Sequence, residues 1–238
     1  MRQLLLILFG LVILCVVNAS IGAAYSKRYC DETWVDCIKI QRGQSWQKLW
    51  PDPAERDLVQ RLNRTNMRLQ PGMTIAVPKN LSVNVNSISP LRQQIRPFET
   101  PTIVVSLNKL AWAAYSSDGQ LQKWGPVSGG RNYCPDIESS CRTKTGVYYI
   151  YYKRGAECVS TKFPIEEGGG APMPYCMFYY GGYALHGSPQ VPGYHASHGC
   201  IRLFTEDAQW LNQEFTDGVR TRVIVLPYDE GVDSEENL

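Results

Sequence analysis

The distribution of cysteine constrains this chain more than any other feature of its sequence. Eight cysteines occur in 238 residues, and Cys15 alone lies in an N-terminal apolar run over residues 4–17. The run follows Arg2, precedes several small residues, and is shorter than the roughly 20 residues that span a bilayer. This pattern is typical of an export signal. We therefore expect residues 1–24 to hold a signal peptide that is cleaved after Ala19 or Ala24, and the remaining thiols to meet an oxidising compartment.

Beyond the leader, most cysteines have a neighbour with which they can pair. The three local pairs are Cys30 with Cys37, Cys134 with Cys141, and Cys158 with Cys176. These disulfides would leave Cys200 as a single thiol, either bridged to another chain or kept reduced for its reactivity. An odd number of cysteines leaves one over however they pair, so the count alone does not select Cys200.

Composition excludes several classes of protein. With 44% hydrophobic and 19% charged residues, the chain is predicted to be globular, neither disordered nor a multispanning membrane protein. The formal net charge is +2, and both signs are spread along the chain. This distribution gives no electrostatic basis for a nucleic-acid partner. The acidic tail, residues 229–238, is predicted to be a solubilising end rather than a ligand site.

Residues 37–79 are predicted to form a small βααβ domain. An alternating run at residues 38–41 predicts a strand, and Ser45 is a suitable N-cap for a short helix after it. Leu58 and Leu62 share one face of a second predicted helix. A turn then leads into an apolar strand that ends at Pro78.

This segment resembles a LysM module. The residues that carry the resemblance are Gly43, Ser45, Trp46, Asn63, Asn66, Pro71, Gly72, Ile75, Val77 and Pro78. The resemblance implies binding to N-acetylglucosamine polymers of the wall glycan, although such a module can also be a spacer. Between residues 38 and 79 the chain has eight Lys or Arg against three Asp or Glu. This excess favours an anionic wall polymer, or it is only a solvated face.

Residues 80–100 are rich in Asn, Ser and Pro and are predicted to be a linker that can pack on its neighbour. Residues 101–228 are predicted to be mainly β, because β-rich runs recur through them. Their single predicted helix covers residues 206–215, with Thr205 as its N-cap. We expect a β-sandwich-like or barrel-like domain with one principal helix.

All three histidines of the chain, His186, His195 and His198, lie close to Cys200 in the sequence. Two chemistries fit this cluster. A thiol nucleophile needs an imidazole to take its proton and N–H donors for the oxyanion, and Gly199 allows a close backbone approach. A metal site would instead use the three imidazoles with the thiolate, starting from the H-x-x-H spacing.

The motif SHGCIRL at residues 197–203, with LHG at residues 185–187 upstream, resembles the signature of the YkuD-type L,D-transpeptidase domain. This is a family of cysteine acyltransferases that crosslink peptidoglycan. Further landmarks occur in family order: PVSGG at residues 126–130, TKTG at residues 143–146 and MPYCM at residues 173–177. The resemblance covers about residues 102–228 and implies a YkuD-like fold that needs no metal or organic cofactor.

The resemblance implies a role for each residue of the motif. Cys200 would be the nucleophile, His186 the base, and the carbonyl group of Gly187 would orient the imidazole of His186. His198 and the amides of Gly199 and Cys200 would line the oxyanion site.

The resemblance also implies three substrate-binding residues, Ser197, Arg202 and Tyr175. Arg202 would support the loop or meet a substrate carboxylate. Tyr175 would wall the donor groove, although aromatic side chains are more often part of a core. We interpret His195 as a surface-loop residue rather than a ligand.

Family chemistry implies attack on a tetrapeptide stem, loss of the terminal D-alanine, and transfer of the acyl group through a thioester. The implied setting is the periplasm or cell envelope, with a role in wall biogenesis and cell shape. The sequence departs from the family pattern at three places. It has TKTG in place of the usual TPTG, Thr205 near the position of a usual Asn, and a short loop before Ser197. The acceptor stays open between another stem peptide, a lipoprotein lysine and water, the last giving an L,D-carboxypeptidase.

Two functions from other classes remain as alternatives. One is a non-catalytic protein that binds peptidoglycan or another surface, and the other is a zinc-dependent hydrolase.

Overall fold

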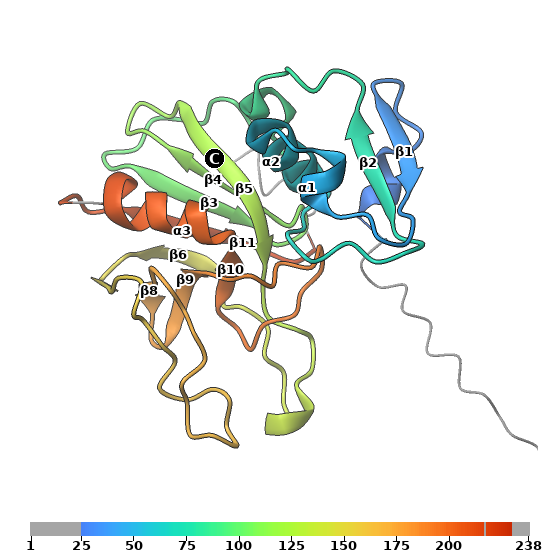
Figure 1. The fold of residues 1–238 in the computed structure, drawn as a ribbon. Helices are drawn as coiled ribbons and strands as arrows, with labels where there is room; N and C mark the ends of the chain where they lie inside the picture. The colour runs from blue at the N-terminus through green and yellow to red at the C-terminus, as the bar shows by residue number, and fades with distance from the viewer. Residues whose placement is uncertain (1–24, 217, 230–238) are drawn as a thin grey trace, which may run out of the picture.

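The computed structural model describes residues 25–216 and 218–229, which form a small N-terminal module and a larger C-terminal domain (Figure 1). The predicted export signal and nearly all of the acidic tail lie outside the described residues. Within the described ranges, no helix has both the length and the apolar character needed to cross a membrane.

The N-terminal module has the predicted order of strand, helix, helix and strand. Its elements are a 3₁₀ turn at Ser26–Tyr29, β1 at Val35–Lys39, α1 at Trp46–Leu49, α2 at Pro53–Leu62 and β2 at Thr74–Pro78. The two strands pair antiparallel. The hydroxyl of Ser45 accepts a hydrogen bond from the amide of Lys48, so the predicted N-cap is present. Asp52 caps α2 in the same way.

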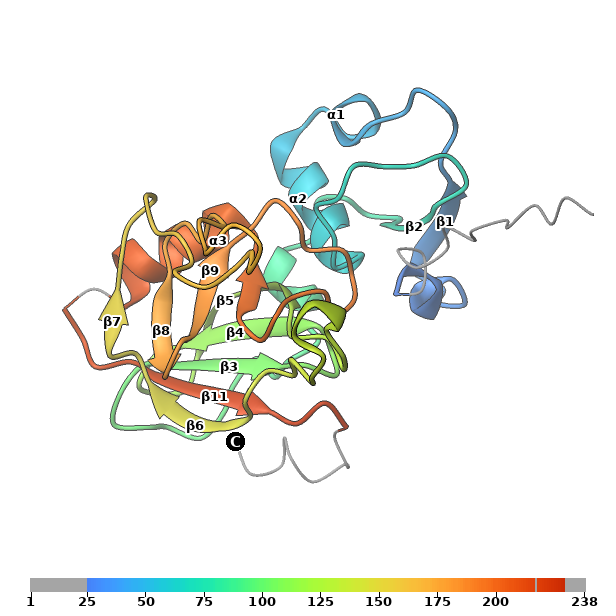
Figure 2. The same cartoon turned by 90° about the horizontal axis from the view of Figure 1, so that it is seen from below.

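The C-terminal domain is built on one nine-stranded sheet that curls, as the different directions of β3 and β8 show in Figure 2. The sheet order is β6-β11-β3-β4-β5-β10-β9-β8-β7. The strands are β3 at Thr102–Ser106, β4 at Ala111–Tyr115, β5 at Leu121–Ser128, β6 at Gly146–Tyr149, β7 at Tyr152–Lys153, β8 at Met177–Tyr180, β9 at Tyr183–Gly187, β10 at Ile201–Leu203 and β11 at Arg222–Leu226. The prediction of a mainly β domain with one main helix is therefore confirmed.

The main helix, α3, covers Thr205–Trp210 and continues as a wider π-type turn through Leu211–Phe215. The prediction of Thr205 as its N-cap is wrong. Since β10 ends at Leu203, a single residue separates the strand from the helix, and Phe204 takes the cap position with no side-chain capping bond. Thr205 is already the first helical residue.

Both faces of the central strands are covered, which explains their continuous apolar sequences. On one face, Val105, Trp112 and Leu185 pack in the same core as Ala208 and Leu211 of the helical segment. On the other face, strand residues share a second core with two buried residues of the segment before β3. These two residues are Leu91 and Ile95. The segment predicted to be a linker therefore packs on the sheet.

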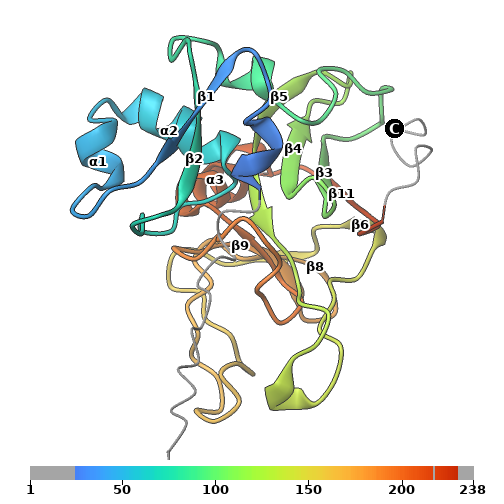
Figure 3. The ribbon, with the colours of Figure 1, turned by 90° about the vertical axis from the view of Figure 1, so that its right-hand side faces the viewer.

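In Figure 3, α2 lies on the side of the module that faces the C-terminal domain. Two arginines, one in α2 and one in the turn after it, join the module to this domain. Arg61 binds both carboxylate oxygens of Asp207 at 2.8 and 2.9 Å, and it also donates to the carbonyl group of Trp124 at 2.6 Å. Arg64 donates to the carbonyl group of Lys109 and stacks over the ring of Trp124. Both arginines are buried. They therefore belong neither to a solvated face nor to a surface for wall polymers, which corrects part of the charge argument.

The Arg61–Asp207 pair gives a stability prediction. Arg61→Met removes a bidentate partner from a carboxylate with 0% exposure, although Lys123 remains 3.1 Å away. We expect the free energy of unfolding, measured by urea denaturation, to fall by about 3 kcal/mol, because a buried charge loses its compensation. The control is Arg68→Met, since Arg68 is exposed. Equal stability of the two variants would contradict this account of the interface.

Candidate active site

The predicted base lies on β9, and the predicted nucleophile directly precedes the neighbouring strand β10. β10 pairs parallel with β9, so that Arg202 lies opposite His186 and Ile201 lies opposite Leu185. Cys200 directly precedes β10. Because side chains alternate between the two faces of a strand, this register places Cys200, Arg202 and His186 on the same face of the sheet.

The imidazole of His186 is fixed in one tautomer by its own strand. Its Nδ1 atom lies 2.9 Å from the carbonyl oxygen of Gly187, the contact that the family resemblance implies. A carbonyl oxygen only accepts, so Nδ1 carries the hydrogen, and Nε2 of the neutral ring has a free lone pair. Burial lowers the pKa of His186 to about 4; the Gly187 contact opposes this shift, and the charge of Arg202 adds to it. The ring is therefore neutral near pH 7.

The thiol of Cys200 is free and half-buried. Its Sγ atom lies 3.6 Å from the carbonyl oxygen of Gly182. Burial raises the pKa of Cys200, while a hydrogen bond from the backbone of Ala184 and the charge of Arg202 lower it. The other six cysteines of the described chain form the three local disulfides Cys30–Cys37, Cys134–Cys141 and Cys158–Cys176.

The turn before the thiol needs a glycine at position 199. Gly199 has φ +119°, and a Cβ atom there would lie 2.7 Å from Cε1 of Tyr183. The hydroxyl of Ser197 accepts a hydrogen bond from the amide of Gly199 and donates one to the carbonyl group of Cys200. Ser197 is buried and closes the turn, and its role in substrate binding stays a prediction. The amide of Gly199 donates to this hydroxyl at 3.1 Å, and its oxyanion role stays a prediction.

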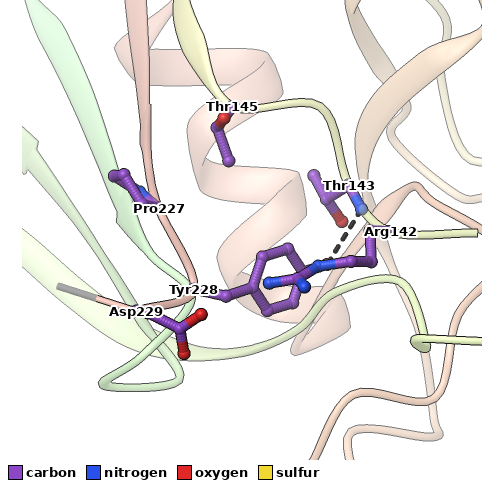
Figure 4. Close-up of a pocket in the computed structure, with 6 residues that line it drawn as sticks. All are labelled: Arg142, Thr143, Thr145, Pro227, Tyr228 and Asp229. Carbon is purple, nitrogen blue, oxygen red and sulfur yellow. Dashed lines mark hydrogen bonds between the residues drawn. The ribbon is translucent and has the colours of Figure 1, made fainter.

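A second layer supports this turn from behind. The hydroxyl of Thr143, in the TKTG motif, donates to the carbonyl group of Gly199 at 2.8 Å. The hydroxyl of Tyr228 in turn accepts from the amide of Thr143 at 2.8 Å, as Figure 4 shows. A hollow of about 260 Å³ is lined by Arg142, Thr143, Thr145, Pro227, Tyr228 and Asp229. Because Cys200 does not line it, this hollow is not the site of the thiol chemistry.

His198 lies where two disulfide-bonded loops meet. Its Nε2 atom lies 2.8 Å from the carboxylate of Asp136, in the Cys134–Cys141 loop. Its ring packs 4.6 Å from the ring of Phe163, in the Cys158–Cys176 loop. The hydrogen bond from His198 lowers the pKa of Asp136. The structure thus places this imidazole in a contact between loops, a position that the sequence motif alone did not indicate.

His195 lies in a loop, as interpreted from the sequence, but it is not fully exposed. Its side chain is half-buried, and Nδ1 accepts a hydrogen bond from the amide of Gly129 at 3.2 Å. The ring also packs edge-on against Tyr228. Burial lowers the pKa of His195 to about 4. A turn residue can be buried when the chain folds back over it, and the local sequence does not report that packing.

The histidines do not form the four-residue metal set considered from the sequence, because each contacts a different partner. Among the described residues, one group of potential ligands lies close enough to share an ion: Cys134, Asp136 and His198. The sulfur of Cys134 is held in a disulfide and is not a free thiolate ligand. This arrangement gives the zinc alternative no support.

Two predicted substrate residues are near the site but make structural contacts. Arg202 donates to the carbonyl group of Gln190 at 3.4 Å, which fits its predicted loop-supporting role. Tyr175 is half-buried and packs against the main core. The sequence analysis did not single out Tyr183, which lies against the turn before Cys200, or Asp136, which contacts His198. The Tyr183 contact leaves no local pattern, although the disulfide loop that holds Asp136 was visible in the sequence.

Comparison with known proteins supports this reading of the domain. Residues 100–225 match the YkuD family, described as the L,D-transpeptidase catalytic domain. The chain belongs to this family. None of the curated proteins compared with it gives a match.

Two solved structures of L,D-transpeptidases are among the matches. An L,D-transpeptidase from Xylanimonas cellulosilytica has 22% identity and a TM-score of 0.53, over 71% of this chain and 78% of that chain. An L,D-transpeptidase from Stackebrandtia nassauensis has 18% identity and a TM-score of 0.46, over 61% of this chain and 64% of that chain. The first likeness shows a common fold.

The two pKa shifts predict how the free thiol reacts. Since both Cys200 and His186 favour their neutral forms, the rate of alkylation of Cys200 by iodoacetamide should rise with pH through an inflection above the ordinary thiol value. Mass spectrometry of the intact protein measures this rate. The control is the denatured, unreduced chain, whose inflection should lie near the ordinary value. A plateau from pH 5 upward would indicate a resting thiolate–imidazolium pair and would contradict the prediction.

Proposed function

We propose that this protein is an exported L,D-transpeptidase that uses Cys200 to form a thioester with peptidoglycan stem peptides. The observation that carries the proposal is the free thiol of Cys200 next to β9, the strand of His186. The Nδ1 atom of His186 is in turn held by the carbonyl group of Gly187. Membership of the YkuD family supports this assignment. The three disulfides support export, because such bonds persist in oxidising compartments. We place the protein in the periplasm or cell envelope.

In the first half-reaction, Nε2 of His186 removes the proton from Cys200 as sulfur attacks the carbonyl carbon of the L-to-D amide. The S–C bond forms, and the amide of Cys200 is the proposed donor to the resulting oxyanion. The C–N bond then breaks, and the imidazolium gives its proton to the departing D-alanine amine. A thioester and neutral His186 remain.

The lowered pKa of His186 suits the second part of this step. An imidazole that is hard to protonate is a weak base, but the imidazolium that it forms is a strong acid toward the leaving amine. Since burial raises the pKa of the thiol, proton transfer accompanies attack instead of preceding substrate binding. In the second half-reaction, the acceptor amine attacks the thioester carbonyl carbon and loses a proton to His186. The C–S bond breaks, and the imidazolium returns the proton to the sulfur of Cys200.

We further propose that residues 37–79 are a LysM-like module that docks on the wall glycan. The βααβ order supports this, and six of the eight cations in the segment remain outside the Arg61 and Arg64 interface. The acceptor of the acyl group is a neighbouring stem peptide in this proposal. A lysine of a wall lipoprotein and water are the other acceptors that the product analysis separates.

The first test of the function is the covalent adduct. A carbapenem is a strained acyl donor, so the wild-type chain should gain one carbapenem mass and Cys200→Ala should gain none. The matched control is the double variant Cys134→Ala and Cys141→Ala, which removes two sulfurs near the site and keeps the nucleophile. An adduct that survives in Cys200→Ala would refute the assignment.

The same variants, incubated with defined tetrapeptide muropeptides, separate the possible outcomes. Crosslinked dimers in the mass spectrum indicate transpeptidation, whereas tripeptides with free D-alanine indicate carboxypeptidase activity. Binding to isolated wall without any new product would favour the non-catalytic alternative.

The second test concerns the base. His186→Gln keeps a polar side chain but removes the proton acceptor, so the rate constant for acylation should fall by about 10²–10⁴-fold. Stopped-flow fluorescence with a carbapenem measures this rate. Near-UV circular dichroism of the variant checks that the fold is kept. An acylation rate within a factor of about three of wild type would exclude His186 as the base, since general-base catalysis supplies far more.

A further inference from the structure

The N-terminal module holds a loop that begins at the proposed active site. Asn66 donates to the carbonyl group of Ser188 at 2.9 Å and accepts from the amide of Val191 at 2.9 Å. Its own amide donates to the carbonyl group of Val191 at 3.2 Å. One residue of the module thus makes three hydrogen bonds to the loop after β9, and Figure 2 shows this loop reaching the module near α2.

The loop is continuous with the groups that orient the base. Ser188 directly follows Gly187, whose carbonyl oxygen contacts Nδ1 of His186. The amide of Ser188 is bonded to the carbonyl group of Leu203 in β10. Two residues further on, the carbonyl group of Gln190 accepts a hydrogen bond from Arg202. A shift of this loop would therefore rotate the peptide group between Gly187 and Ser188, whose carbonyl oxygen fixes the imidazole of His186.

Asn66 follows a buried segment of the module. Its three preceding residues, Asn63, Arg64 and Thr65, are all buried. Thr65 forms a bridge with Pro192, the residue after Val191. Asn63 bonds to Val59 and to the backbone of Ala76 within the module. The two asparagines therefore differ in their partners: Asn63 bonds within the module, whereas Asn66 bonds to the C-terminal domain.

We propose that Asn66 is a positioning residue for the acyl transfer. Through Ser188 it holds the carbonyl group of Gly187, and through that group it sets the tautomer and direction of the His186 ring. The N-terminal module is then part of the catalytic machinery as well as a docking device. This inference rests on the proposed transpeptidase function for its kinetic readout, and it has a second readout that does not need activity.

The kinetic test is Asn66→Ala in the full chain. The substitution removes both side-chain bonds to the loop, and misplacement of a catalytic group by about 1 Å can cost about 10²-fold in rate. We expect kcat for transfer between stem peptides to fall by about 10–100-fold, with a much smaller change in KM. The acidic limb of the kcat profile should also move to lower pH, because the Gly187 contact raises the pKa of His186.

The control for the kinetic test is Asn80→Ala. Asn80 also bonds to a backbone amide through its side chain, that of Ser82, but it lies outside the loop contact. Its kcat should match that of wild type. If Asn80→Ala loses as much activity as Asn66→Ala, or if Asn66→Ala changes KM alone, the positioning role is overturned.

The second readout is the Nδ1 proton of His186 in ¹⁵N-edited NMR spectra, which three histidines make easy to assign. In Asn66→Ala we expect this proton to exchange faster with water than in wild type and in Asn80→Ala. An unchanged exchange rate would overturn the inference. If the exchange rate rises while the wild-type chain shows no acyl transfer, the positioning contact stands and the proposed function fails.

Discussion

The parallel pairing of β10 with β9 is the constraint on which the rest of the site depends. β10 has only three residues, and it lies between β5 and β9 in the sheet. Its pairing with β9 is what relates Cys200, the residue before β10, to His186. The register Arg202–His186 also puts a guanidinium on the same face, where its charge opposes protonation of the imidazole and favours the thiolate. The placement of the candidate catalytic residues thus follows from strand register.

A three-residue strand cannot hold its own position, and the surrounding contacts supply the support. The turn before β10 is closed by a hydrogen bond from Ser197 to the carbonyl group of Cys200. Tyr183 can lie against this turn because position 199 is a glycine. Behind it, Thr143 connects the turn to Tyr228 near the end of the described chain. The helix that follows is tied to the module through the Arg61–Asp207 pair. These contacts join segments from the whole chain around one thiol.

Much of this arrangement could be predicted from the sequence, where the signal is local. Cysteines seven residues apart can only close small loops, and the βααβ order follows from caps and apolar spacing. The predictions fell short where a tertiary contact decides the outcome. Nothing near His195 shows that the chain covers it, and nothing in α2 shows that Arg61 meets a carboxylate 146 residues away. Charge counting treated that arginine as surface, although its partner makes it part of the interior.

The two disulfide-bonded loops follow the same physical logic as the module. Neither the Cys134–Cys141 loop nor the Cys158–Cys176 loop contains a helix or strand of more than three residues, so the backbone alone would not keep either in place. Each is closed by a covalent bond, and the two meet on the ring of His198 through Asp136 and Phe163. Cys200 is two residues further along the chain. Disulfides therefore hold the two loops that meet on His198. Asn66 holds the loop after β9. Both kinds of bond take the place of regular secondary structure next to the site.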